Sequence, residues 1–240
     1  MAAMAALIET AAASEPDGII VSLPDAAALG PAIKSAVADG IPVITMNSGL
    51  ESSAELGALM HVGQPERLAG EAAGARAASE GVTNGLCLNQ EAFNTALVDR
   101  CSGYFAGLGG DLNMIDVSND PAQIETRTAA ALEADESIDG VLAVGPHVCE
   151  AATKAIEAVG ADVHLACFDL SPGVMDMIED GRASFTIDQQ QRLQGYMPVI
   201  VLHLYNNHAG LLPGNNIASG PGFVDKSNAA QVKALAGIDR

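Results

Sequence analysis

The chain has 240 residues, 49% of them hydrophobic and 3% aromatic, and a formal net charge of −19 at pH 7. A hydrophobic fraction of this size excludes a disordered chain, and 11 basic residues against 30 acidic ones exclude the cationic surface that nucleic acid or an anionic membrane requires. No apolar stretch approaches the roughly 18 residues of a membrane-spanning helix, so no direct membrane insertion is expected.

Short runs rich in Val, Ile and Leu alternate along the chain with helical patterns, which is the rhythm of parallel βαβ units. Residues 1–14 form an amphipathic helical pattern without an N-cap residue and without the basic start of a signal peptide. Strands are predicted near 18–22, 42–46, 58–62, 84–89, 112–117, 140–144, 163–168 and 183–187. Further helices are predicted near 28–38, 65–80, 94–108, 122–134, 148–159, 172–180 and 190–207. This order predicts an α/β fold with doubly wound parallel sheets.

An internal repeat supports a division into two similar lobes. The segment from Asp17 to a strand end at Asn47 aligns without gaps, at an offset of 122 residues, on the segment from Asp139 to a strand end at Asp169. Identities are sparse, but strand, turn, helix and second strand coincide, which favours two related lobes over a chance likeness of two βαβ units.

The predicted N-terminal lobe comprises 1–63 and 190–213, and the predicted C-terminal lobe comprises 64–189 and 214–240. Two complete strand–helix units precede the second copy of the repeat, whereas only the helical pattern at 1–14 precedes the first copy. We therefore expect the first lobe to lack its first strand, helix and strand, on the order of 40 residues.

The four cysteines do not form a recognisable metal or redox motif. They contain no C-x-x-C pair and no histidine at zinc-ligand spacing, and they are Cys87, Cys101, Cys149 and Cys167. This pattern favours small buried side chains, with a disulfide between two of them as the alternative. The chain also lacks a G-x-G-x-x-G after a strand, a P-loop, a G-x-S-x-G elbow and an H-E-x-x-H. We therefore predict no catalytic residue, no metal and no cofactor. The alternative hypothesis is a small-molecule enzyme with a Rossmann-like sheet.

Polar side chains follow the predicted strands at the edge where parallel sheets bind ligands. Asn47 and Asp169 stand at matching positions of the repeat. An amide that donates and accepts, together with a carboxylate that only accepts, suits a polyhydroxylated molecule. The alternative for either residue is that it caps the turn that follows it.

Five further residues are candidates for the same site. Phe168 could stack on a sugar face or belong to the core. Arg100 and Asn94 lie on one predicted helix and could face the ligand, with a solvent-facing Arg and a helix cap as alternatives. Gln64 and Gln189 each follow a strand where the chain could cross between lobes, so either is a hinge spacer or a ligand contact.

Six strings occur in an order that resembles the type I periplasmic sugar-binding proteins of ABC importers, the ribose-binding-like family. They are Asp17-Gly-Ile-Ile-Val-Ser, Ile41-Pro-Val-Ile-Thr-Met-Asn47, His61-Val-Gly-Gln64, Arg100-x-x-Gly103, Phe168-Asp169 and Thr186-Ile-Asp-Gln189 followed by Gly195-Tyr196. The likeness covers essentially the whole chain. In that family two lobes joined by three crossovers close on a sugar, and the membrane subunits of the transporter read the closure.

By position, the resemblance implies seven residues that bind a monosaccharide or polyol. They are Asn47, Gln64, Asn94, Arg100, Asp169 and Gln189, with Phe168 near the ring. It also implies a periplasmic location, ABC transporter permease and ATPase subunits as partners, and capture instead of catalysis. Ser48 stands where ribose binders usually have Arg, and Gly145 where many members have Asn, which argues against ribose. The effector-sensing domain of a LacI-like transcriptional regulator has the same fold and is the alternative.

Overall fold

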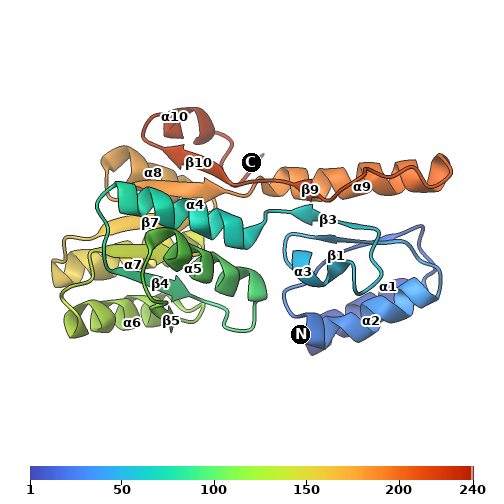
Figure 1. The fold of residues 1–240 in the computed structure, drawn as a ribbon, viewed down its shortest axis with the longest axis horizontal. Helices are drawn as coiled ribbons and strands as arrows, with labels where there is room; N and C mark the ends of the chain where they lie inside the picture. Colours follow the sequence, from blue (N-terminus) through green and yellow to red (C-terminus); the bar gives the residue numbers. More distant parts are fainter. Residues whose placement is uncertain (239) are drawn as a thin grey trace. The chain divides into compact units, whose positions relative to one another are not determined.

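Strands and helices alternate as predicted in the computed structural model, which describes residues 1–238 and 240 (Figure 1). The main strands are β1 (Ile19–Ser22), β2 (Val43–Met46), β3 (Met60–Gly63), β4 (Gly85–Asn89), β5 (Met114–Asp116), β6 (Gly140–Ala143), β7 (His164–Phe168) and β8 (Phe185–Asp188). The main helices are α1 (Ala2–Ala13), α2 (Ala26–Ala38), α4 (Glu66–Ser79), α5 (Thr95–Leu108), α6 (Pro121–Ala134), α7 (Pro146–Val159), α8 (Pro172–Asp180) and α9 (Gln191–Asn207). The predicted α/β class is confirmed.

Four short elements were not predicted from the sequence. They are α3 (Leu50–Ser53), β9 (Ile217–Ala218), β10 (Gly222–Asp225) and α10 (Ala229–Val232). Each has only two to four residues.

The described chain divides into two compact units. The first unit comprises Met1–Pro65, Phe93–Thr95 and Gln190–Ser219, and the second comprises Glu66–Ala92, Ala96–Gln189 and Gly220–Arg240. The sequence assigns 64–65, 93–95 and 214–219 to the second lobe, but the structure places these residues in the first unit. For 214–219 the reason is that β9 pairs in parallel with the end of β3.

The first unit is built on a parallel sheet with the strand order β1-β2-β3-β9. Val43 and Ile44 are neighbours on β2 and face opposite sides of the sheet. Val43 joins the core under α1 and α2, whereas Ile44 joins the core under α9. Helices therefore cover both faces, as parallel sheets require.

The second unit contains a six-stranded sheet with the order β10-β8-β7-β6-β4-β5, in which only β10 runs antiparallel to its neighbour. One core lies between the sheet and helices α6, α7 and α8, and another lies between the sheet and helices α4 and α5 (Figure 1). This is a doubly wound, three-layer arrangement.

The strand register confirms the internal repeat. Ile19 pairs with Val43 in the first unit, and Val141 pairs with Leu165 in the second. Both partners are displaced by the same 122 residues, so the gap-free alignment of the sequence describes two equivalent βαβ units.

Helices α4 and α5 meet backbone against backbone at glycine residues. A Cβ atom added to Gly70 would lie 2.2 Å from the carbonyl oxygen of Arg100, and one added to Gly74 would lie 1.9 Å from that of Tyr104. On α5, Gly103 would meet the α4 backbone at 2.1 Å in the same way. No side chain fits at these positions, so the glycines set the distance between the two helices.

Two disulfides link helices to strands in the second unit. Cys87 of β4 is bonded to Cys101 of α5, and Cys149 of α7 is bonded to Cys167 of β7, with Cα–Cα distances of 5.7 and 5.8 Å. All four side chains are buried. The expectation of unpaired cysteines is therefore wrong. The first bridge anchors α5 to the sheet one residue from Arg100.

Asp139 ties the start of β6 to the start of β4. Its carboxylate accepts hydrogen bonds from the backbone N–H groups of Thr83 at 3.0 Å and Asn84 at 2.8 Å, and from the Thr83 hydroxyl at 2.7 Å. Partial burial acts to raise the pKa of Asp139, but these hydrogen bonds outweigh it and hold the pKa below its ordinary value.

We expect Asp139→Asn to lower the free energy of unfolding at pH 7 by about 1–2 kcal/mol. A lowered folded-state pKa stabilises the fold above the unfolded-state pKa of about 3.9, and the contribution is lost as the pH falls through the folded-state value. Urea titrations between pH 7 and 3 should therefore show the difference between the two proteins narrowing below about pH 4. A difference that stays constant over this range would contradict the assignment.

Candidate ligand-binding site

Asn47 and Asp169 occupy equivalent strand ends in the two units. Both have a left-handed backbone, with φ of 61° and 69°. The N–H of Asn47 donates to the carbonyl of Val62 on the neighbouring strand at 3.0 Å, and the N–H of Asp169 donates to that of Ile187 at 2.7 Å. Asn and Asp tolerate this conformation better than other side chains that carry a Cβ. Strained backbone at a strand end is typical of functional positions.

Arg100 of α5 contacts two carboxylates and a backbone carbonyl in the second unit. Its Nε and Nη2 donate to the two carboxylate oxygens of Glu66 at 2.7 and 3.0 Å, and its Nη1 donates to the carbonyl of Val144 at 3.0 Å. The side chain is buried, with 3% of the residue exposed. The bidentate pair crosses from α5 to α4 at the glycine contact, so helix packing fixes the guanidinium.

Asp169 lies between Arg100 and Gln189. One carboxylate oxygen lies 3.5 Å from Arg100 Nη1, and the other accepts a hydrogen bond from Gln189 Nε2 at 2.6 Å. The Thr186 hydroxyl donates to the Asp169 carbonyl at 2.7 Å and fixes the strand end. The Asp169 side chain is 14% exposed and is therefore less deeply buried than the Arg100 side chain, which is 4% exposed.

The charges of this group are set by burial and by each other. Burial raises the pKa of Asp169, and the adjacent Arg100 and the hydrogen bond from Gln189 oppose the rise without cancelling it. Burial alone would lower the pKa of Arg100, but the charges of Glu66 and Asp169 raise it, so Arg100 stays protonated. One guanidinium thus faces two carboxyl groups, an environment that favours a neutral ligand with hydroxyl donors over an anion.

Phe168 does not have the role expected from the sequence. Its ring is fully buried, and Arg100 Cζ lies 4.6 Å from the ring centroid. The ring belongs to the core between the sheet and helices α4 and α5. The interpretation that Phe168 stacks on a sugar face is therefore wrong. The Arg100 guanidinium lies over the Phe168 ring in a cation–π contact instead.

In the first unit, Asn47 is held by hydroxyl and amide groups. Its Oδ1 accepts from the hydroxyls of Ser22 and Ser48, both at 3.2 Å, and its Nδ2 donates to Gln194 Oε1 at 3.4 Å. Gln194 Nε2 donates in turn to the Ser219 hydroxyl at 2.8 Å. These contacts fix which end of the Asn47 amide is the acceptor and which is the donor.

The remaining predicted residues lie in the first unit. Gln64 follows β3 and is fully buried, and Asn94 directly precedes α5 and is 9% exposed. The structure thus brings together Arg100, Asp169 and Gln189 in the second unit. Asn47, Gln64 and Asn94 belong to the first unit, where Asn47 stands at a strand end of its own.

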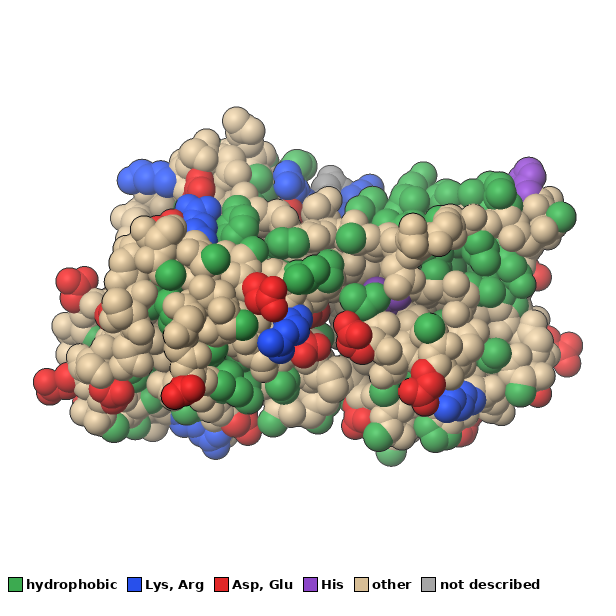
Figure 2. Space-filling view, viewed as in Figure 1, with side chains coloured by type: hydrophobic (Ala, Val, Ile, Leu, Met, Phe, Trp, Pro, Cys, Tyr) green, Lys and Arg blue, Asp and Glu red, His purple; other side chains and the backbone are tan. Residues whose placement is uncertain are grey.

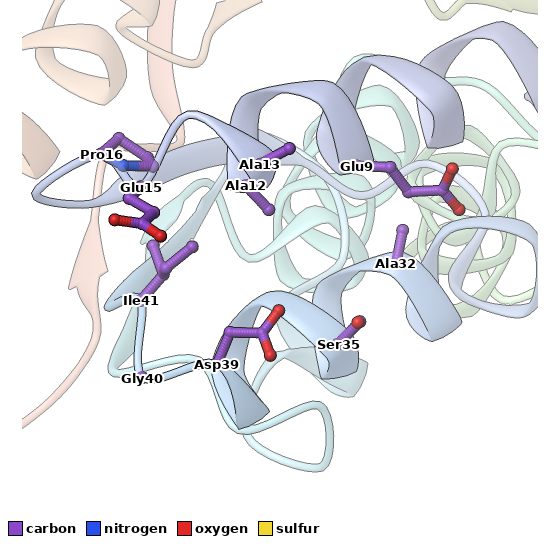
Figure 3. A pocket seen from close by; sticks show the side chains of 10 residues that line it. All are labelled: Glu9, Ala12, Ala13, Glu15, Pro16, Ala32, Ser35, Asp39, Gly40 and Ile41. Atoms are coloured by element: carbon purple, nitrogen blue, oxygen red, sulfur yellow. The ribbon is translucent and has the colours of Figure 1, made fainter.

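A cavity of about 610 Å³ opens between α1 and α2, away from these strand ends (Figure 3). Its walls include Pro16 and Ile41, which precede β1 and β2, so it lies at the amino edge of the sheet. Glu9, Glu15 and Asp39 contribute carboxylates to its lining. Ligands of parallel sheets bind at the carboxyl edge, so this cavity is not the site that the strand ends form.

Three further observations concern metal ions, membranes and basic surfaces among the described residues. Among them, no group of three or more His, Cys, Asp or Glu side chains could hold a metal ion. None of the described helices has the length and apolar character needed to cross a bilayer. On the face drawn in Figure 2, the Lys and Arg side chains do not merge into one basic surface.

Comparison with known proteins assigns the family. The family described as periplasmic binding protein domain matches residues 1–208. The chain belongs to the periplasmic binding protein family. The match includes both copies of the internal repeat and every strand-end residue discussed above.

Solved relatives of this periplasmic binding protein carry small polyhydroxylated ligands. A carbohydrate transporter from Acidothermus cellulolyticus 11B in complex with myo-inositol is 41% identical, with a TM-score of 0.93 over 97% of this chain and 82% of the other. A periplasmic solute-binding protein from Actinobacillus succinogenes 130z with bound D-allose is 22% identical, with a TM-score of 0.82 over 95% and 84% of the two chains. The second likeness shows the fold alone.

A curated relative matches a shorter part of this periplasmic binding protein. The xylose/arabinose-binding protein of Sulfolobus acidocaldarius is 38% identical over 69 residues, which are 29% of this chain and 17% of the relative. Its match therefore spans well under two thirds of the relative's length.

Several polar residues of this periplasmic binding protein that surround the candidates were not predicted from the sequence. They are Ser22, Glu66, Thr186, Gln194 and Ser219. Glu66 gave only the ordinary signal of an acidic residue in the first turn of a helix. Ser22 and Thr186 lie within strings that carry the family resemblance, but the strings do not show what the two hydroxyls contact. The partners of Gln194 and Ser219 are distant in sequence and meet only in the folded first unit.

Proposed function

We propose that this protein is the substrate-binding component of an ABC-type sugar importer that captures a monosaccharide or polyol by closure of its two lobes. The observation that carries the proposal is the buried group formed by Arg100, Asp169 and Gln189 at the carboxyl ends of β7 and β8. The proposed site adds Asn47, Gln64 and Asn94 from the first unit. The 41% identical relative in complex with myo-inositol supports the ligand class.

The chemistry of Asp169 suits vicinal hydroxyl groups. A carboxylate offers about four acceptor positions, and Gln189 and Arg100 occupy one on each oxygen. Each oxygen can therefore accept one hydroxyl from a ligand that carries two neighbouring hydroxyls. Such bonds to an ionised group are worth roughly 1.5–3 kcal/mol each when they are shielded from water.

The proposed importer role implies a cellular location and protein partners. We propose that the protein acts in the periplasm and that ABC permease and ATPase subunits receive the ligand from it. The family assignment and the titles of the solved relatives support this context. The closed form would present a different surface to the permease than the open form, which couples occupancy to transport.

Isothermal titration calorimetry with inositols, pentoses, hexoses and linear polyols tests the proposal. We expect at least one of them to bind with a stoichiometry of one, and mass spectrometry should recover it unchanged after incubation. Cyclohexanol, with a single hydroxyl, is the matched negative ligand. Failure of the whole panel to bind would refute the proposed function, and chemical conversion of the ligand would favour an enzyme.

A further inference from the structure

Gln90 lies at the same sheet edge as the proposed site but was not among the predicted residues. It directly follows β4, and Gly145 stands two residues beyond the end of β6, the strand next to β4. A Cβ atom added to Gly145 would lie 2.8 Å from Gln90 Nε2. The Gln90 amide therefore occupies the space where a side chain at position 145 would stand.

The backbone does not explain why position 145 is a glycine. Gly145 has φ of −164° and ψ of 158°, an extended conformation that any residue adopts. It is the N-cap of α7 and makes no side-chain cap, although Ser, Thr, Asp and Asn are preferred there. The glycine thus gives up a cap, and the atoms nearest to an added Cβ belong to the flexible Gln90 amide.

The acceptor end of this amide has no protein partner. Gln90 Oε1 is buried, and no described residue donates a hydrogen bond to it. Buried polar atoms are nearly always hydrogen-bonded, so an exception requires a reason. The unpaired oxygen destabilises the folded protein, and a hydrogen bond from a bound ligand would offset this destabilisation.

Gln90 is linked to the proposed site through the consecutive residues Val144 and Gly145. The carbonyl of Val144, the residue before Gly145, accepts the hydrogen bond from Arg100 Nη1 at 3.0 Å. The Arg100 guanidinium and the Gln90 amide therefore lie against two consecutive residues, Val144 and Gly145 respectively, and Arg100 also contacts Asp169. All of these groups belong to the second unit.

We propose that Gln90 is a ligand-contacting residue that determines specificity among polyols. Its terminal amide turns about a broad torsion, and Oε1 accepts a hydrogen bond from a ligand hydroxyl next to those held by Asp169. The inference rests on the proposed function and deepens it. It assigns to Gln90 the recognition of one hydroxyl, which separates ligands that carry this group from those that lack it.

The first test needs no ligand. Gln90→Met keeps the length of the side chain and removes the amide, so the unpaired oxygen disappears. We expect the unfolding temperature of the free protein to stay unchanged or to rise by up to about 4 °C. In the control Gln189→Met, the loss of the 2.6 Å hydrogen bond to Asp169 should lower it. A lowered unfolding temperature in Gln90→Met would overturn the inference, because it would show a structural role.

The second test uses the tightest ligand of the panel and its single-deoxy analogues. We expect Gln90→Met to weaken binding of the parent ligand about 10-fold or more, while one deoxy analogue binds wild type and variant equally. Unchanged affinity for the parent, or equal losses for every analogue in both proteins, would overturn the inference. If the wild type binds no polyol at all, the proposed function is overturned, and with it the ligand proposed for Gln90. A lowered unfolding temperature of Gln90→Met, in contrast, overturns only the inference about Gln90.

Discussion

Asp169→Ala is expected to weaken polyol binding at least about 100-fold, which would place it beyond detection by calorimetry for a ligand of moderate affinity. The carboxylate is proposed to accept two ligand hydroxyls, each worth roughly 1.5–3 kcal/mol, and about 1.4 kcal/mol corresponds to a factor of ten. The substitution also removes one of the two carboxylates facing Arg100. The remaining Arg100–Glu66 pair has no net charge, and both Glu66 oxygens are bonded to Arg100, so the ligand would lose its carboxylate acceptor.

The loss should be one of binding and not of folding. Arg100 keeps its bidentate pair with Glu66 and its bond to Val144 in this variant, so no buried charge is left unpaired. The matched control is Asp180→Ala on α8, a carboxylate that is 63% exposed in the same unit. We expect the control to bind as the wild type does. Wild-type affinity in Asp169→Ala would exclude this carboxylate from the site.

Gly74→Ala is expected to produce the largest loss of stability among conservative substitutions. The added Cβ would lie 1.9 Å from the carbonyl oxygen of Tyr104 and 2.8 Å from the backbone nitrogen of Leu108. Backbone atoms cannot turn away as a side chain does, so α4 and α5 must separate. We expect a loss of roughly 2–4 kcal/mol, about 5–15 °C in unfolding temperature for a chain of this size.

The matched control for this prediction is Gly195→Ala in α9, where no atom lies within 4 Å of the added Cβ. Alanine has the higher helix propensity, so this variant should gain up to about 1 kcal/mol. Both variants are compared by thermal unfolding followed by circular dichroism. Equal unfolding temperatures for Gly74→Ala and the wild type would show that the two helices are not locked by their glycines.

The sequence predicts the main elements because their hydrophobic periods are long and their boundaries are marked. Ser171 and Pro172 mark the start of α8, and the side chain of Ser171 accepts the capping hydrogen bond from Val174. The repeat is visible because its two copies have equal lengths. Asn47 and Asp169 could be selected for the same reason, since a gap-free alignment places both at strand ends.

Contacts between distant segments could not be predicted. Cys87 and Cys101 are 14 residues apart, but nothing in the spacing shows that β4 and α5 bring them together. Gly70 and Gly74 are seen to share a helix face, yet the sequence does not identify α5 as what they pack against. The sequence also shows Gly145 without showing that an amide from another strand end lies over it.

A crystal structure of the protein with its tightest polyol tests the central claim most directly. We propose that Asn47 and Asp169, which follow equivalent strands of the duplicated βαβ unit, bind one and the same ligand. We predict ligand oxygens within about 3.2 Å of the Asp169 carboxylate, the Arg100 guanidinium and the Asn47 amide. A ligand held by one of these strand ends alone, or bound in the cavity between α1 and α2, would contradict the account.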